Sequence, residues 1–194
     1  METRGQGGYH GGMGIVIGSK TKLTYDDYVQ FPDDGKRHEI IDGDHFVTPA
    51  PGTNHQRVSR LILFELMRQI EKKGLGEVYD APTDVQFSLT DVVQPDLIVV
   101  LTRKRKIVTP TKIKGVPDLV VEILSRSTEK VDRGLKRELY QRAGVPEFWL
   151  VDSADQSIEQ HVLEAGTYRL VATEHKRISF RGLPGVTIDL SEVW

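Results

Sequence analysis

Two short apolar runs, each interrupted by one acidic residue, constrain the fold of this 194-residue chain more than any other feature. They read VQPDLIVV around Asp96 and PDLVVEILS around Glu122. Short runs rich in Val, Ile and Leu are typical of buried β-strands. A carboxylate inside such a run is costly unless a partner, a metal ion or a raised pKa compensates it. We therefore expect neighbouring strands whose two carboxylates form a metal site.

The spacing around Glu122 matches part of a known catalytic pattern. Because side chains alternate along a strand, Glu122 and Leu124 share one face. Many metal-dependent nucleases place a Pro-Asp at the start of one strand and an acidic-x-Lys triplet in the next. Here Pro95-Asp96 and Glu122 match these elements, but the lysine position of the triplet is Leu124.

A lysine is available in the segment that follows. Ser127 or Thr128 reads as the N-cap of a helix that runs to about Arg142. Residues spaced by four are expected to pack on the sheet: Val131, Leu135 and Leu139. A second stripe has the same spacing: Asp132, Lys136 and Tyr140. Spacing alone equally allows Asp132 and Lys136 to form an exposed ion pair of little energetic weight.

The ordered series of motifs from about Leu23 to the C-terminus resembles the Uma-two (Uma2) family of restriction-endonuclease-like proteins, within the PD-(D/E)XK nuclease superfamily. The series comprises TYDDYVQFP, RHEIIDG, TPAPGTNHQRVSRLI, QPDLIVV, PDLVVEILSRST and GVPEFWLVD. The resemblance implies an α/β fold, with a restriction-endonuclease-like mixed β-sheet flanked by helices. It implies an active site in which the lysine has moved from the strand to the next helix. The four catalytic positions would be Glu39, Asp96, Glu122 and Lys136.

The resemblance also implies a metal-dependent endonuclease that hydrolyses phosphodiester bonds in nucleic acid, with DNA as the expected substrate. Asp96 and Glu122 would hold Mg²⁺, or Mn²⁺ in its place, because Mg²⁺ usually takes one or two carboxylates plus substrate phosphate. Three further side chains are candidates for supporting this site: His55, Gln94 and Tyr140. A homodimer is expected, for which the apolar C-terminal residues Val193 and Trp194 are weak support.

Basic residues follow both carboxylate-bearing strands, although the net charge of the chain is −2. The candidates for binding nucleic acid are Arg103, Lys104, Arg126, Lys130 and Arg133. We expect the two clusters to line one end of the sheet and hold a phosphate backbone. For the first cluster, a solvated loop is the competing interpretation.

The rest of the pattern fits one domain over residues 19–194, preceded by a flexible Gly-rich tail over 1–18. A hairpin around Asp42-Gly43 is expected to carry Glu39, and a helix from Asn54 to about Lys73 is expected to end at Gly74. The chain contains no cysteine. It has neither a membrane-length apolar run nor a secretion signal, so we expect a cytoplasmic protein.

Two other classes of protein remain open. A catalytically inactive nucleic-acid-binding or interaction module on the same fold would be favoured if Lys136 pointed to solvent, far from Glu122. A different hydrolase or metal-binding protein would be favoured if Glu39 and His55 lay within ligand distance and Asp96 did not.

Overall fold

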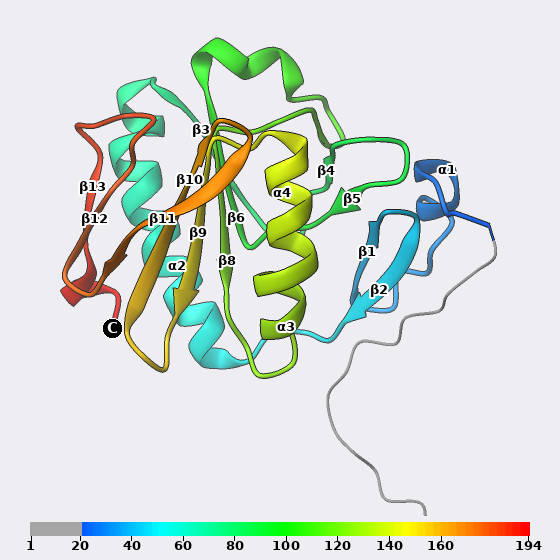
Figure 1. Ribbon diagram of the computed structural model, residues 1–194, viewed down its shortest axis with the longest axis horizontal. Helices are drawn as coiled ribbons and strands as arrows, with labels where there is room; N and C mark the ends of the chain where they lie inside the picture. The colour runs from blue at the N-terminus through cyan, green and yellow to red at the C-terminus, as the bar shows by residue number, and fades with distance from the viewer. Residues whose placement is uncertain (1–20) are drawn as a thin grey trace, which may run out of the picture.

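A six-stranded mixed sheet forms the centre of the computed structural model, which describes residues 21–194 (Figure 1). The strand order is β11-β10-β9-β8-β6-β3, and all neighbours are antiparallel except the parallel pair β8 and β9. The strands are β3 (Gly76–Asp80), β6 (Leu97–Leu101), β8 (Leu119–Ile123), β9 (Glu147–Asp152), β10 (Ser157–Glu164) and β11 (Thr167–Glu174). The expected tail over residues 1–18 lies outside the described residues.

Helices cover both faces of this sheet (Figure 1). Helix α2 (Thr53–Gln69), extended by η1 (Glu71–Lys73), lies on one face and ends at Gly74, whose φ is +68°. A continuous helical segment made of α3 (Glu129–Val131), η3 (Asp132–Lys136) and α4 (Arg137–Ala143) lies on the other. This segment joins β8 to β9, because parallel neighbours require a crossover connection. The mixed sheet flanked by helices is the fold class expected from the sequence. None of the helices in the described region has the length and apolar character needed to span a membrane.

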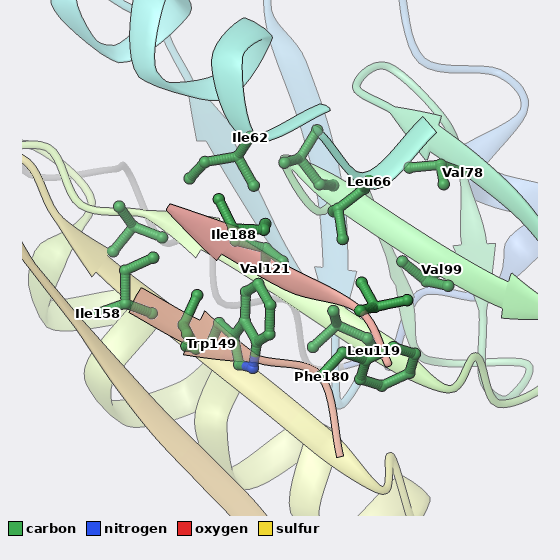
Figure 2. Close-up of a cluster of buried hydrophobic side chains, with 14 of the residues drawn as sticks. Ile62, Leu66, Val78, Val99, Leu119, Val121, Trp149, Ile158, Phe180 and Ile188 are labelled. Atoms are coloured by element: carbon green, nitrogen blue, oxygen red, sulfur yellow. The ribbon is translucent and has the colours of Figure 1, made fainter. Parts of the chain in front are cut away.

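The larger apolar core lies between α2 and the sheet (Figure 2). The inner face of α2 and its C-cap residue contribute fully buried side chains at helical spacing: Val58, Ile62, Leu66 and, at the C-cap, Ile70. The C-terminal elements β12 (Arg177–Ser179), β13 (Thr187–Asp189) and η4 (Leu190–Glu192) add Phe180 and Ile188 to the same core. Val193 is also buried there, and the Trp194 indole nitrogen donates to the His175 carbonyl at 3.2 Å. The expectation that the C-terminal apolar residues need a partner surface is therefore wrong.

A second, smaller sheet stands beside the first and has the order β2-β1-β5-β4-β7. Its strands are β1 (Arg37–Ile41), β2 (Asp44–Thr48), β4 (Val85–Gln86), β5 (Val92–Val93) and β7 (Ile113–Lys114), preceded in the chain by the short helix α1 (Tyr25–Tyr28). Strands β1 and β2 form the expected hairpin. Asp42 and Gly43 both have positive φ, at +50° and +72°, as a two-residue type I′ turn requires. The hairpin carries Glu39 toward the central sheet.

The register between β6 and β8 brings the two buried carboxylates together. Leu97 pairs with Val121 and Ile98 with Val120. Continuing this antiparallel register by one residue places Asp96 opposite Glu122. Directly opposed residues of antiparallel strands point to the same face of the sheet. Both carboxylates therefore lie on the face covered by α4, and their strands are neighbours, as expected from the sequence.

The helical segment after β8 departs from the expected periodicity. Residues 132–136 form a π-helical turn, in which the Arg137 amide donates to the Asp132 carbonyl five residues earlier. This wider turn changes which side chains face the sheet. Leu139 is fully buried as expected, but Leu135 is 42% exposed. The prediction that Leu135 packs on the sheet is wrong because it assumed an uninterrupted α-helical period.

Candidate active site

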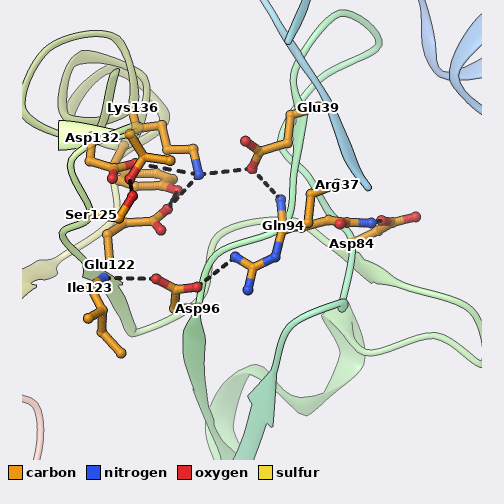
Figure 3. Close-up of polar contacts among 12 residues, drawn as sticks. Arg37, Glu39, Asp84, Gln94, Asp96, Glu122, Ile123, Ser125, Asp132 and Lys136 are labelled. Carbon is orange, nitrogen blue, oxygen red and sulfur yellow. Dashed lines mark hydrogen bonds and ion pairs between the residues drawn. The ribbon is translucent and has the colours of Figure 1, made fainter. Parts of the chain in front are cut away.

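The side chain of Lys136 lies at the centre of a buried acidic cluster (Figure 3). Its Nζ atom is 2.9 Å from Glu39 Oε1, 3.1 Å from Glu122 Oε1 and 3.7 Å from Asp132 Oδ1. Each of these side chains is at most 6% exposed. The interpretation of Lys136 and Asp132 as an exposed ion pair is therefore wrong, because the lysine is buried among three carboxylates.

The π-helical turn sets the position of Lys136. Asp132 and Lys136 are its first and last residues, and both point from η3 toward the end of β8. Tyr140 follows one turn later and donates its hydroxyl to Glu122 Oε1 at 2.5 Å. Leu124 packs with Tyr140 in the apolar cluster between α4 and the sheet. The helix thus supplies the ammonium that β8 lacks, while Leu124 contributes to the core.

Asp96 is held by three donors from different parts of the chain. Arg37 Nη1 contacts Oδ1 at 2.6 Å, His55 Nε2 contacts Oδ2 at 3.0 Å, and the backbone amide of Ile123 donates to Oδ2 at 2.8 Å. A carboxylate offers about four lone-pair positions, so these donors leave room for one further contact. His55 is thereby brought into the site. Its Nδ1 atom is buried and has no hydrogen-bond partner in the described region.

Glu39 lies in β1 of the second sheet and is held by Gln94, the residue that follows β5 of the same sheet. The backbone amide of Gln94 donates to Glu39 Oε1 at 2.8 Å. The side chain of Gln94 points away and donates to Asp84 at 2.9 Å (Figure 3). It also donates to the Tyr28 hydroxyl at 3.0 Å. Gln94 therefore contacts the site through its backbone amide, while its side chain is engaged outside the carboxylate cluster.

Burial and charge shift the pKa values of this cluster in opposite directions. Burial, reinforced by the neighbouring carboxylates, raises the pKa of Glu122 to about 8 against the opposing effect of Lys136. Burial likewise raises the pKa of Asp132 to about 6.

Burial would also raise the pKa of Asp96, but His55 and Arg37 outweigh it and lower the pKa to about 2. Burial opposes the charged form of Lys136, yet the surrounding carboxylates raise its pKa well above the usual value. Within the pair of strand carboxylates, the raised pKa therefore falls on Glu122 and the lowered pKa on Asp96.

The cluster opens onto a cavity of about 470 Å³. Its polar lining includes Arg37, Glu39, Asp96, Glu122, Asp132 and Lys136. The carboxylates are therefore withdrawn from bulk water but accessible to a ligand that enters the cavity. Buried ionisable groups with shifted pKa values on the wall of a cavity are characteristic of functional sites.

The two basic clusters lie at different ends of the sheet. Because β6 and β8 are antiparallel, the residues after β6 lie at the end remote from Asp96. There, in η2 (Thr102–Ile107), Arg103 and Lys104 contact the buried Asp118 at 2.5 and 3.3 Å. The expectation that both clusters line one end is wrong, and Arg103 and Lys104 are distant from the site.

The second basic cluster lies at the end that carries the acidic cluster. Arg126 and Lys130 are exposed, and neither forms a hydrogen bond or ion pair with any described residue. Arg133 contacts Glu159 at 2.7 Å and Glu129 at 3.1 Å. Arg126 and Lys130 are therefore available to a ligand, whereas Arg133 is engaged within the protein.

Two residues of the cluster were absent from the expected site: Arg37 and Asp132. Arg37 lies two positions before Glu39, and strand alternation places both on one face of β1. That spacing could have identified Arg37. Asp132 was visible as part of the helical stripe, but its burial depends on the π-helical turn.

The fold and the buried cluster together define a restriction-endonuclease-like α/β domain. The Uma2 family, described as "Putative restriction endonuclease", matches residues 25–191. The uncharacterized protein slr1290 of Synechocystis sp. (strain ATCC 27184 / PCC 6803 / Kazusa) is 30% identical over 142 residues, which cover 71% of this chain and 73% of that protein. The chain belongs to the Uma2 family.

A solved structure agrees with this fold. The crystal structure of a "putative nuclease" belonging to DUF820 from Anabaena variabilis ATCC 29413 matches with a TM-score of 0.71. The match covers 88% of this chain and 97% of that chain at 16% sequence identity. At this identity the similarity is evidence of a shared fold.

Proposed function

We propose that this protein is a metal-dependent endonuclease that hydrolyses phosphodiester bonds in nucleic acid, with DNA as the preferred substrate. One observation carries the proposal: a buried ammonium, Lys136, lies between Glu39 and Glu122 on the wall of an open cavity, with Asp96 opposite Glu122. Four buried carboxylates and one lysine are costly to stability, so a functional role is the simplest reason for the arrangement.

The chemistry of the donors suits a divalent cation. When the four carboxylates of Glu39, Asp96, Glu122 and Asp132 are all ionised, they exceed the two permanent cations, Arg37 and Lys136, by two negative charges. Asp132 Oδ1 is buried without a hydrogen-bond partner in the described region. No group of three or more His, Cys, Asp or Glu residues between 21 and 194 is arranged to hold an ion. Mg²⁺ usually takes one or two carboxylates and keeps several waters, so Asp96 and Glu122 would hold Mg²⁺ or Mn²⁺ together with water and substrate phosphate.

Each residue of the cluster has a separate role in the proposed reaction. A bound divalent cation would polarise the phosphate and lower the pKa of an attacking water. Lys136 donates to the phosphoryl oxygens as negative charge develops on them. Glu39 orients the water, and its own orientation is set by the Gln94 amide. Tyr140 positions Glu122, as His55 and Arg37 position Asp96.

The geometry of the site does not meet the condition that would favour either of the two other classes of protein. An inactive module would be favoured by a solvent-facing Lys136, yet its ammonium is 3.1 Å from Glu122 and buried. A site built on Glu39 and His55 would exclude Asp96, yet His55 contacts Asp96 itself at 3.0 Å. The endonuclease proposal is therefore the one that the geometry supports best.

A cleavage assay over a panel of substrates tests the proposal. The purified protein is incubated with duplex DNA, single-stranded DNA and RNA, each with Mg²⁺, with Mn²⁺ or with EDTA. We expect cleavage of DNA that requires the added cation and stops with EDTA. No cleavage of any substrate with either cation would contradict the proposed function, and cleavage of RNA alone would correct the substrate.

We also propose that the protein is a cytoplasmic homodimer, since two equivalent sites match the two strands of a duplex. The C-terminus is packed internally, but α2 carries two of the exposed large apolar side chains of the described region, Phe64 at 57% and Met67 at 38%. Sedimentation velocity at micromolar concentration should give a dimer, and Phe64→Glu should shift it toward the monomer. A wild-type monomer at every concentration would contradict this proposal.

A further inference from the structure

A second cavity adjoins the acidic one. Its volume is about 640 Å³, and the two cavities share lining residues Lys36, Arg37, Ala50 and Pro51. The acidic cluster lines the first cavity only. A ligand that extends from the acidic cavity into the second cavity therefore passes Arg37, which lines both.

Arg37 is placed to hold a charged group at this boundary. Its side chain is 19% exposed, and Nη1 contacts Asp96 at 2.6 Å. The other guanidinium donors make no hydrogen bond to any residue in the 21–194 region. Arginine recognises phosphate through several donors at once, so Arg37 can contact Asp96 and a phosphate together.

The chemistry of the second cavity differs from that of the first. Aromatic and proline side chains form much of its wall, including Tyr28, Phe31, Pro32 and Pro82. Gln94 also lines it, and its Oε1 atom is buried without a hydrogen-bond partner in the described region. The rest of the lining is largely polar and charged, including Asp33, Lys36, Asp84 and Thr111. A cavity that combines aromatic walls with hydrogen-bonding groups suits a flat ligand with hydrogen-bonding edges, and aromatic side chains are common stacking surfaces for unpaired bases.

We propose that the second cavity binds the base of the nucleotide next to the scissile phosphate, while Arg37 holds the phosphate between the two cavities. This inference rests on the proposed nuclease function and adds a subsite to it. Because a paired base cannot enter a cavity, the proposal requires that nucleotide to be unpaired or extruded from a duplex.

Photo-crosslinking tests the position of the base. A short single-stranded oligodeoxynucleotide carrying one 5-iodouracil is bound to the full chain with Ca²⁺ and irradiated, and crosslinked peptides are mapped by mass spectrometry. The expected crosslinks fall on Tyr28, Phe31 or His38, which line the second cavity. Replacing the modified nucleotide by an abasic one should abolish them.

A matched pair of variants separates this subsite from general binding. Gln56 is an exposed residue in the first turn of α2 that lines the second cavity, whereas Gln30 is exposed and lines neither cavity. Gln56→Glu should lower the crosslink yield about fivefold or more, because it adds a negative charge to the wall of the cavity that holds the nucleotide, and Gln30→Glu, which adds the same charge outside both cavities, should not.

The outcomes distinguish the two proposals. Crosslinks on other segments, or equal yields from both variants, would overturn the subsite while leaving a nuclease that still cleaves. Cleavage without any crosslink would also overturn the subsite and leave the nuclease function standing. The absence of both crosslinking and cleavage would overturn the nuclease function and the subsite together.

Discussion

Replacing Lys136 by methionine should lower the free energy of unfolding by about 3–5 kcal/mol in EDTA at pH 8, because removing one partner leaves buried charges uncompensated. Methionine is of similar length, so little of the loss comes from packing. The pKa values of Glu122 and Asp132 are raised to about 8 and about 6, so both carboxylates take up protons as the pH falls. A protonated carboxyl is neutral and gains little from a neighbouring ammonium. The difference in free energy of unfolding between the variant and the wild type should therefore be smaller at pH 5 than at pH 8. Urea denaturation of both proteins at pH 8 and at pH 5 measures this difference.

The same substitution should lower single-turnover cleavage by about 10²-fold or more, the effect of losing one positioned donor to the transition state. Lys130→Met is the matched control, since Lys130 is exposed in the same helical segment and has no partner among the described residues. It should change the free energy of unfolding by less than about 0.5 kcal/mol. Normal cleavage by Lys136→Met would remove this lysine from the active site.

Asp96→Asn should lower cleavage by about 10³-fold or more, equivalent to about 4 kcal/mol in the barrier, because a neutral amide is a poor ligand for a hard cation. The amide keeps the shape and one acceptor oxygen, but Arg37 loses its charged partner. We therefore expect a loss of stability of about 2–4 kcal/mol, measured by urea denaturation beside the cleavage assay.

Asp118→Asn controls for this loss of stability. Asp118 is 1% exposed, accepts from the Leu101 amide at 2.8 Å and contacts Arg103 at 2.5 Å. It resembles Asp96 in burial and partners but lies at the opposite end of the sheet. Asp118→Asn should lose similar stability and cleave normally. Equal loss of cleavage in both variants would show that stability, and not chemistry, accounts for the effect.

The parts of the site that follow from local patterns could be predicted from the sequence. Asp96 and Glu122 stand out because a carboxylate in a buried strand is costly, whereas their common face follows from the register between β6 and β8. The Asp42-Gly43 turn predicts the hairpin that carries Glu39. The assignment of the lysine came from the family resemblance, because helical spacing alone did not distinguish Lys136 from a surface ion pair.

Other features depend on contacts that no local pattern contains. Arg37 and Asp96 are 59 positions apart, and the second sheet includes strands of only two residues, too short to show alternation. The π-helical turn shifts the helical period and exposes Leu135. The two basic clusters were expected at one end because the antiparallel direction of β6 and β8 cannot be read from their compositions.

Calorimetric titration of the protein with Mn²⁺ tests the central claim most directly, since the proposed chemistry requires the acidic cluster to bind a divalent cation. We expect Mn²⁺ to bind the wild-type protein and the Asp118→Asn variant with similar affinity. Glu122→Gln should weaken binding by about tenfold or more, because the cation loses one of its two charged protein ligands. Wild-type protein that binds no Mn²⁺, or a Glu122→Gln variant that binds it as tightly, would contradict the account.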